Sequence, residues 1–170
     1  RDRLRSRGLG DVYKRQMINM GLVKIKGVDV VLQGLWKFGN DWVFDSRLSY
    51  TYQKAQDFTD KSDKDTYGGQ ISYIPWHSGS AILNAGYKSW ELNYSFIYTG
   101  ERYDVSANTP ENYRLPWYTS DFSLAKKFSW RKYDFKLTLE VNNIFNQQYE
   151  VVRSYPMPGT NFKFILNLTI

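Results

Sequence analysis

The feature of this sequence that most constrains its fold is a repeated alternation of apolar and polar residues. In "WELNYSFIYTG" (residues 90–100), aromatic and aliphatic side chains occupy nearly every second position, and polar side chains fill the positions between them. The last ten residues, "NFKFILNLTI", alternate in the same way, with only Ile165 out of pattern. A period of two is typical of a β-strand with one apolar and one polar face. The sequence therefore predicts an all-β fold and leaves open what the apolar face contacts.

Seven segments of this kind are separated by alternately short and long connections. They span about residues 28–38, 42–54, 71–87, 90–99, 117–128, 133–145 and 161–170. Tight turns are expected at 39–41, 88–89 and 129–132, and longer polar loops near 55–70, 103–114 and 150–159. In the third segment, Pro75, Gly79 and Gly86 predict a bulge or an irregular section. The order predicts an antiparallel sheet with its tight turns at one end and its long loops at the other.

The composition suits a sheet with one apolar and one wet face. Aromatic residues make up 18% of the chain, yet the mean hydropathy is −0.57. No segment has the run of roughly 18 apolar residues that a transmembrane helix needs, whereas a membrane-spanning strand needs only about 9–11 residues. Long strands joined by short turns on one side and long loops on the other are typical of outer-membrane barrels. The sequence therefore predicts an antiparallel transmembrane β-barrel segment with short periplasmic turns and long extracellular loops.

The positions of the aromatic residues support a membrane location. Amphipathic aromatic rings gather at the two membrane–water interfaces of such barrels. The residues expected there are Trp36, Phe38, Trp42, Tyr87, Trp90, Phe128, Trp130 and Tyr133 beside the tight turns, and Tyr50, Tyr52 and Tyr98 near the loops. Charged residues on the opposite face of the strands suit a water-filled lumen. The alternative architecture is a soluble β-sandwich with one solvated face.

Residues 1–16 differ from the rest of the chain. They hold six basic and two acidic residues, so residues 17–170 carry a net charge of only +2 and give no indication of nucleic-acid binding. The segment Ser6–Gln16, "SRGLGDVYKRQ", resembles the in-frame translation of a transposon-based sequencing adaptor. Residues 1–16 are therefore expected to be a non-native, disordered leader and are excluded from the fold. Because an odd number of strands with open edges does not suit a bacterial barrel, the native chain is expected to continue upstream of Met17.

Six motifs carry a family resemblance. They are "VKIKGVDVVLQG", "YIPWH", "YTGERYD", "LPWYTSDFSLAKKF", "EVNNIFNQQYE" and "YPMPGTNFKFILNLTI". With these motifs in this order, over about residues 19–170, the sequence resembles the C-terminal part of the barrel of TonB-dependent outer-membrane receptors. The resemblance implies a plugged barrel of about 22 strands in the outer membrane of a Gram-negative bacterium. It also implies uptake of a scarce small molecule, such as an iron–siderophore complex or a corrinoid. The TonB–ExbB–ExbD complex would supply the energy through an N-terminal region outside this sequence.

The last strand has a role of its own in this interpretation. As the closing strand it would pair with the first strand of the barrel and present its apolar face to outer-membrane lipid. The residues of that face are Phe162, Phe164, Leu166, Leu168 and Ile170. The resemblance implies that this segment is the signal read by the barrel-assembly machinery. The family usually ends in Phe or Trp, so Ile170 is a departure that still continues the apolar face.

The sequence contains no catalytic constellation, cofactor motif or metal site, so the chain is not expected to be an enzyme. It has no cysteine, and a structural role is expected for its only histidine, His77. Arginine and tyrosine side chains in the loops would suit an anionic, aromatic-rich chelate. The candidate ligand residues are Arg102, Tyr103, Tyr113, Arg114, Arg153 and Tyr155. Asn142, Asn143, Pro156 and Gly159 match family motifs and are expected to make turns.

Two further classes of protein stay open. Another outer-membrane barrel, such as a passive porin, an adhesin or a translocator, would share the fold without active uptake. A soluble β-rich binding module would instead refold in water as a monomer.

Overall fold

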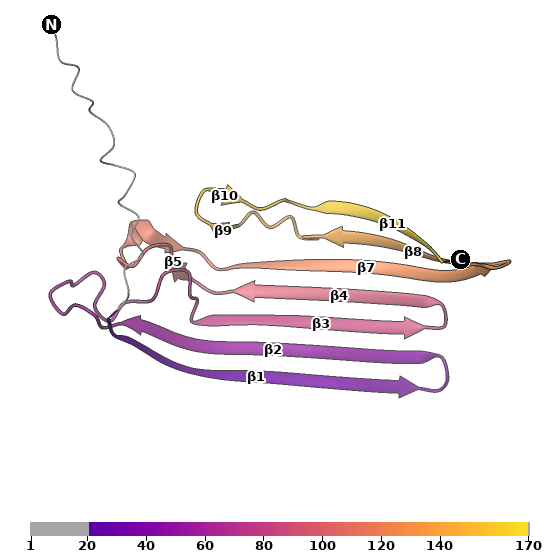
Figure 1. Ribbon diagram of the computed structural model, residues 1–170, viewed down its shortest axis with the longest axis horizontal. Coiled ribbons are helices and arrows are strands. Elements are labelled where there is room, and N and C mark those ends of the chain that lie inside the picture. The colour runs from indigo at the N-terminus through magenta and orange to yellow at the C-terminus, as the bar shows by residue number, and fades with distance from the viewer. Residues whose placement is uncertain (1–20, 170) are drawn as a thin grey trace, which may run out of the picture.

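Seven long strands form one antiparallel sheet in the order β1-β2-β3-β4-β7-β8-β11 (Figure 1). The structure is a computed structural model that describes residues 21–169, so the expected leader and Ile170 lie outside the described residues. The strands are β1 Val23–Phe38, β2 Trp42–Asp57, β3 His77–Tyr87, β4 Trp90–Thr99, β7 Trp117–Trp130, β8 Tyr133–Asn142 and β11 Asn161–Thr169. The prediction of seven antiparallel strands is confirmed.

The connections also alternate as predicted. Turns at 39–41, 88–89 and 131–132 lie at one end of the sheet, and three loops lie at the other (Figure 1). We name these loop 1 (58–76), loop 2 (100–116) and loop 3 (143–160). Loop 2 contains the short pair β5 (Arg102–Tyr103) and β6 (Tyr113–Arg114) and the 3-10 turn Pro110–Asn112. Loop 3 contains the short pair β9 (Glu150–Val152) and β10 (Tyr155–Pro156).

Two boundaries differ from the prediction. The third strand begins at His77, because Pro75 has no N–H for the ladder and residues 71–76 belong to loop 1. The irregular section expected in this segment is therefore found at residues 71–76, whereas a bulge is absent from β3, which keeps an unbroken register with β2 and β4 through Gly79 and Gly86. At the other boundary, β8 ends at Asn142 because Asn143 takes a positive φ of 51°.

The register assigns the side chains of the whole sheet to two faces. One row of paired residues reads Trp36, Phe44, Ala85, Leu92, Leu124, Leu139 and Phe164, from β1 to β11. The next row reads Leu35, Asp45, Asn84, Asn93, Ser123, Glu140 and Lys163. Because adjacent residues of a strand point to opposite sides, the first row lies on what we call the apolar face and the second on the polar face.

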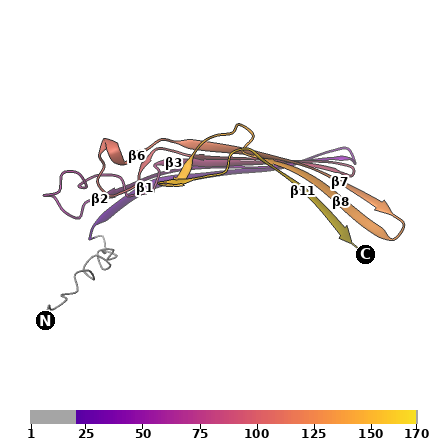
Figure 2. The same ribbon diagram turned by 90° about the horizontal axis from the view of Figure 1, so that it is seen from above.

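The sheet is a single curved layer (Figure 2). Ala55 and Ala125 are the only buried apolar residues among residues 21–169, so the described chain has no hydrophobic core. Large side chains of the apolar face are open instead, with Phe162 76% exposed. Residues 21–169 therefore do not form a sandwich, because a sandwich requires a second sheet to bury these residues. The sheet is also not closed: β1 and β11 are its edges.

The eleven aromatic residues expected at membrane interfaces all lie on the apolar face by register. Eight are near the turns and three are near the loops. Neighbouring rings pack together near the turns, where the Trp42 and Tyr87 centroids are 4.3 Å apart and those of Phe128 and Phe135 are 5.1 Å apart. Among the described residues, no helix is long and apolar enough to cross a membrane.

Candidate functional site

Hydrogen bonds join the three loops into one layer at their end of the sheet. Asn108 of loop 2 exchanges two hydrogen bonds with the backbone of Gln70 in loop 1, at 2.6 and 3.0 Å. The backbone N–H of Tyr73 in loop 1 donates to the carbonyl oxygen of Tyr103 in loop 2 at 2.8 Å. The position of loop 2 therefore depends on loop 1.

Arg102 connects loop 2 to loop 3. Its Nη2 donates to the carbonyl oxygens of Glu150 and Val151 at 2.9 and 3.1 Å. The residue is 3% exposed, and Nη1 is buried with no hydrogen-bond partner in the described part of the chain. Burial lowers the pKa of the guanidinium, but an arginine keeps its proton at neutral pH. A buried positive charge thus holds loop 3 against loop 2.

Asp104 is the second link between these loops. Its side chain is 1% exposed, and its Oδ2 accepts hydrogen bonds from Nε of Arg114 (2.8 Å) and from Nη2 of the same arginine. Arg153 of loop 3 approaches the same oxygen, with Nη1 at 3.5 Å, and its side chain is 55% exposed. The other carboxylate oxygen, Oδ1, is buried and has no hydrogen-bond partner among the described residues. Two of the predicted ligand residues therefore meet at one carboxylate.

The predicted tyrosines lie close to this cluster. Tyr103 and Tyr113 pair across β5 and β6, with ring centroids 5.8 Å apart in an edge-to-face arrangement. Tyr155 is at the tip of loop 3 and is 70% exposed. All six predicted ligand residues thus lie in loops 2 and 3, but they differ in access: Arg102 is buried, Arg114 is half-buried, and Arg153 and Tyr155 are open.

A cavity of about 510 Å³ opens between loops 2 and 3. Trp117 and Tyr149 stack on its wall with ring centroids 4.4 Å apart. The Nε1 of Trp117 is buried and has no hydrogen-bond partner within the described residues. Arg114, Gln147 and Gln148 supply further polar groups to the same cavity.

A second cavity, of about 560 Å³, continues down the polar face from the first. Tyr149 lines both, and Asp121, Asn142 and Lys163 line the lower one. Burial raises the pKa of the Tyr149 phenol, and the negative charge of Asp121 raises it further. The phenol is therefore neutral at pH 7 and can donate a hydrogen bond into the space between the two cavities.

Asn143 holds the loop that carries Tyr149. Its Nδ2 donates to the carbonyl oxygens of Gln147 (2.9 Å) and Pro158 (3.2 Å), and its Oδ1 accepts from the N–H of Gln147 (2.8 Å). Its own N–H donates to Oδ1 of Asp121 at 2.7 Å. The residue is 4% exposed and has a φ of 51°, which an asparagine tolerates better than most residues. The predicted turn role of Asn143 is confirmed, and the side chain joins both ends of loop 3.

The aromatic pair of the upper cavity, Trp117 and Tyr149, was not predicted from the sequence. Both residues lie in segments that the sequence pattern assigns to a strand or a turn. Trp117 does carry a signal, because it is a large aromatic residue at a polar-face position of β7, whereas its neighbour Tyr118 follows the apolar pattern. An aromatic residue out of phase with the alternation is therefore a sequence signal for an aromatic side chain on the polar face.

His77 does not belong to this site. It lies at the start of β3, where its Nδ1 is hydrogen-bonded to the Tyr50 hydroxyl at 2.8 Å, which fits the structural role expected for it. Within residues 21–169 there is no group of three or more His, Cys, Asp or Glu side chains that could hold a metal ion.

Comparison with known proteins gives one family and one structural relative. Residues 2–144 match the family described as TonB dependent receptor-like, beta-barrel, which comprises receptors and transporters and not enzymes. The fold is similar to the crystal structure of the ferric yersiniabactin uptake receptor FyuA from Yersinia pestis, with a TM-score of 0.57 and 15% sequence identity over 86% of this chain. The chain spans 23% of the length of that receptor.

Proposed function

The chain belongs to the TonB-dependent receptor-like β-barrel family, and on this basis we propose that it forms the C-terminal barrel strands of an outer-membrane receptor for active uptake of a scarce small molecule. The observation that carries the proposal is the single seven-stranded sheet, with an uncovered apolar face and loops tied together around a cavity. In the proposal, residues 17–170 belong to a barrel of about 22 strands. Residues 1–16 are a foreign leader.

The two faces of the sheet have different surroundings in this proposal. The apolar face contacts lipid, and its eleven aromatic residues lie at the membrane–water interfaces. The polar face lines a wet lumen, which suits its ion pairs, such as Glu91 with Lys127 and Lys136 at 2.5 and 2.6 Å. The tight turns face the periplasm, and loops 1 to 3 face the outside of a Gram-negative cell.

The ligand is proposed to enter through the cavity between loops 2 and 3. An iron–siderophore complex fits the chemistry there, because a chelate with negative charge and aromatic rings would meet arginine and tyrosine side chains. We assign direct contacts to Arg153, Tyr155 and Tyr113, which are open, and to the Trp117–Tyr149 pair. Arg102, Arg114 and Tyr103 would act by holding the loops, because their side chains are more deeply buried. A corrinoid is the second ligand class to test.

The remaining partners follow from the family. The TonB–ExbB–ExbD complex would act through an N-terminal region, and the barrel-assembly machinery would read the β11 face from Phe162 to Ile170. No nucleic acid, cofactor or catalytic reaction is part of the proposal.

Uptake by the complete receptor tests this function. Cells expressing it are offered radiolabelled ferric catecholate, ferric hydroxamate and cyanocobalamin, with and without a protonophore. The proposal predicts accumulation of one of these that stops when the proton gradient is removed. Accumulation that survives the protonophore would indicate a passive porin, and no accumulation with intact surface display would favour an adhesin or translocator.

Substitution of the cavity wall then tests the site. Trp117→Ala removes one ring of the stacked pair, and we expect ligand affinity to fall by about 2- to 13-fold, the scale of losing an aromatic contact of about 0.5–1.5 kcal/mol. Tyr118→Ala is the matched control, because Tyr118 is the next residue but lies on the apolar face. Equal losses in both variants would assign the effect to folding and would contradict the proposed site.

A further inference from the structure

We propose that the turn end of the apolar face carries a binding site for an anionic phospholipid, with a groove for an acyl chain beside a row of cations for the phosphate. The inference rests on the proposed membrane location and goes beyond it, because it assigns a specific lipid class to specific residues. Two independent sets of contacts support it.

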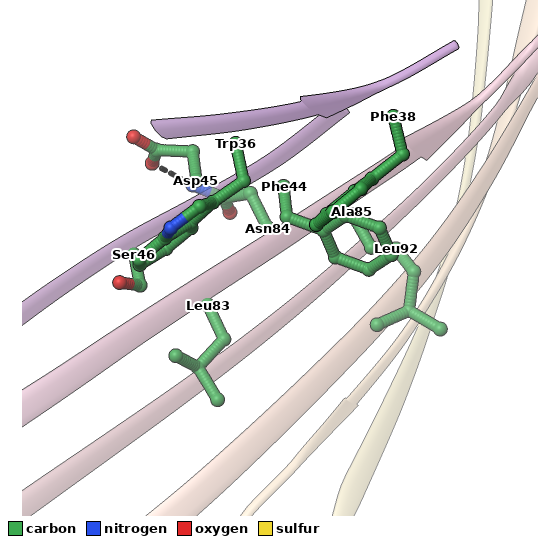
Figure 3. A pocket seen from close by; sticks show the side chains of 9 residues that line it. All are labelled: Trp36, Phe38, Phe44, Asp45, Ser46, Leu83, Asn84, Ala85 and Leu92. Atoms are coloured by element: carbon green, nitrogen blue, oxygen red, sulfur yellow. Dashed lines mark hydrogen bonds between the residues drawn. The ribbon is translucent and has the colours of Figure 1, made fainter. Parts of the chain in front are cut away.

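The first is a groove of about 550 Å³ across β1 to β4 (Figure 3). Its walls are almost wholly apolar and are formed by Trp36, Phe38, Phe44, Leu83 and Leu92, with the small residues Ser46 and Ala85 between them. Asp45 and Asn84 border it, but their side chains belong to the polar face, where they hydrogen-bond each other at 2.9 Å. Small residues flanked by large ones leave a channel of the kind that suits a hydrocarbon chain.

Gly34 contributes to the shape of this groove. A Cβ at this position would lie 2.0 Å from Cη2 of Trp36, so the indole of Trp36 is folded back over the glycine. The indole can lie flat on the sheet only because position 34 has no side chain. The aromatic wall of the groove therefore depends on the glycine at position 34 of β1.

The second observation is a row of cations beside the turns. Lys88, Lys126, Arg131 and Lys132 lie over the rings of Tyr87, Trp90, Trp130 and Tyr133, at 4.6 to 5.2 Å from the ring centroids. All four rings belong to the apolar face. Of the four cations only Lys88 has a carboxylate partner among the described residues, Asp41 at 3.8 Å. The other three are charged side chains directed to the lipid side with no anion to pair with.

The groove and the cations are contiguous. Leu92 of the groove is two residues from Trp90, the ring that supports Lys126, on the same face of β4. Phe44 of the groove stacks on Trp42, which in turn packs on Tyr87 beside Lys88. An acyl chain in the groove would therefore place its phosphate among the cations. The cationic row favours an anionic headgroup, such as that of phosphatidylglycerol, over a zwitterionic one. The proposed orientation assigns the lipid to the leaflet facing the periplasm.

Lipid retention by the complete receptor tests the inference. The purified receptor is exchanged into detergent with phosphatidylglycerol or phosphatidylcholine of identical acyl chains, and bound lipid is counted by native mass spectrometry. We expect phosphatidylglycerol to be retained preferentially. Lys126→Gln should lower its occupancy about fivefold, the contribution of one basic residue near an anionic lipid surface. Equal retention of the two lipids by the wild-type receptor would overturn the proposal.

The neighbouring residue gives a matched control. Lys127 has the same side chain one position further along β7, but it lies on the polar face and pairs with Glu91 at 2.5 Å. Lys127→Gln should leave phosphatidylglycerol occupancy unchanged, and an equal loss in both variants would refute a site on the apolar face. Ala85→Leu fills the groove and should also lower occupancy; unchanged binding would show that the groove takes no acyl chain.

Two further measurements separate this inference from the proposed function. Millimolar inorganic phosphate should not displace the lipid, and displacement would mean an anion site and not a phospholipid site. Ligand uptake by the same variants reports on the receptor itself. A receptor that takes up its ligand but shows no lipid preference contradicts only the phospholipid site. A chain recovered from cells in the aqueous fraction contradicts the proposed function.

Discussion

Replacement of Arg114 by alanine is expected to destabilise loop 2 around Asp104, the carboxylate that Arg153 of loop 3 also approaches. The Asp104 carboxylate is 1% exposed and receives two hydrogen bonds from Arg114, whereas its contact with Arg153 is a single approach at 3.5 Å. In Arg114→Ala the buried carboxylate would retain only the exposed Arg153. Breaking a buried ion pair by removing one partner costs about 3–5 kcal/mol. Because the Arg114 side chain is 26% exposed, solvent screens part of this cost. We therefore expect the substitution to destabilise the loops by about 2–3 kcal/mol.

Hydrogen exchange of the loop amides in the complete receptor measures this cost. A loss of about 2–3 kcal/mol corresponds to opening of loops 2 and 3 that is about 30- to 150-fold more frequent. Arg153→Ala removes the exposed partner of the same carboxylate and should cost no more than about 1 kcal/mol. Removing the carboxylate as well, in Arg114→Ala with Asp104→Ala, should restore part of the protection, because no unpaired buried charge is left. If Arg153→Ala accelerated exchange as much as Arg114→Ala, burial would not be the source of the difference and the reasoning would fail.

Three further predictions concern loop 3, the groove and the last strand. Asn143→Ala should lower the free energy of unfolding by about 2–3 kcal/mol, because it removes two hydrogen bonds to loop carbonyls and keeps a non-glycine residue at a φ of 51°. Thermal unfolding in detergent measures this loss. A loss below about 0.5 kcal/mol would contradict the role assigned to Asn143. Gly34→Val should displace the Trp36 indole from the sheet, which a shift in tryptophan emission would report; an unchanged spectrum would be the contrary result. Phe164→Lys on the apolar face of β11 should reduce the heat-modifiable folded receptor in outer membranes, since a basic residue on a face that meets lipid costs up to about 2–4 kcal/mol. Asn167→Lys, on the polar face of the same strand, is its control.

The two faces of the sheet could be predicted from the sequence, because even- and odd-numbered residues of one strand lie on opposite faces. Every second residue of a strand points to the same side, so the positions of Leu92 or Phe96 in "WELNYSFIYTG" already determine which side they occupy. The start of β3 and the end of β8 were harder to predict. Each depends on local backbone geometry, the missing N–H of Pro75 and the positive φ of Asn143, and not on alternation.

The functional roles of the loop residues were less accessible from the sequence. Arg102 and Arg153 are chemically identical, and both lie in polar loops, yet one is 3% exposed and the other has a side chain that is 55% exposed. The difference arises because Arg102 meets the carbonyl oxygen of Glu150, a residue 48 positions away in another loop. A contact between two loops produces no periodic pattern in the sequence of either loop. The sequence therefore predicts where the arginine and tyrosine side chains gather but not which of them remain accessible.

In a sheet one layer thick, register replaces core packing as the determinant of structure. A shift of one residue would exchange the two faces of a strand, so the turns that set the register decide which side chains lie on the apolar face. Two of these turns contain a non-glycine residue in the left-handed region, Lys88 with φ 52° and Arg131 with φ 57°. Glycine would take this conformation without the cost of about 1–2 kcal/mol that other residues carry there.

Both strained turn positions thus hold a cation where glycine would suit the backbone better. Both cations lie over aromatic rings of the apolar face, at 5.2 Å from the ring centroid in each case. If these residues served only to reverse the chain, a basic side chain would bring cost without benefit. In the proposed site a bound anionic headgroup supplies the benefit, because it gives Arg131 a partner and gives Lys88 a second one beside Asp41. Lys88→Gly and Arg131→Gly should therefore stabilise the receptor in neutral detergent and weaken its retention of phosphatidylglycerol. A gain in stability without loss of lipid would separate the turn chemistry from the lipid site and contradict this explanation.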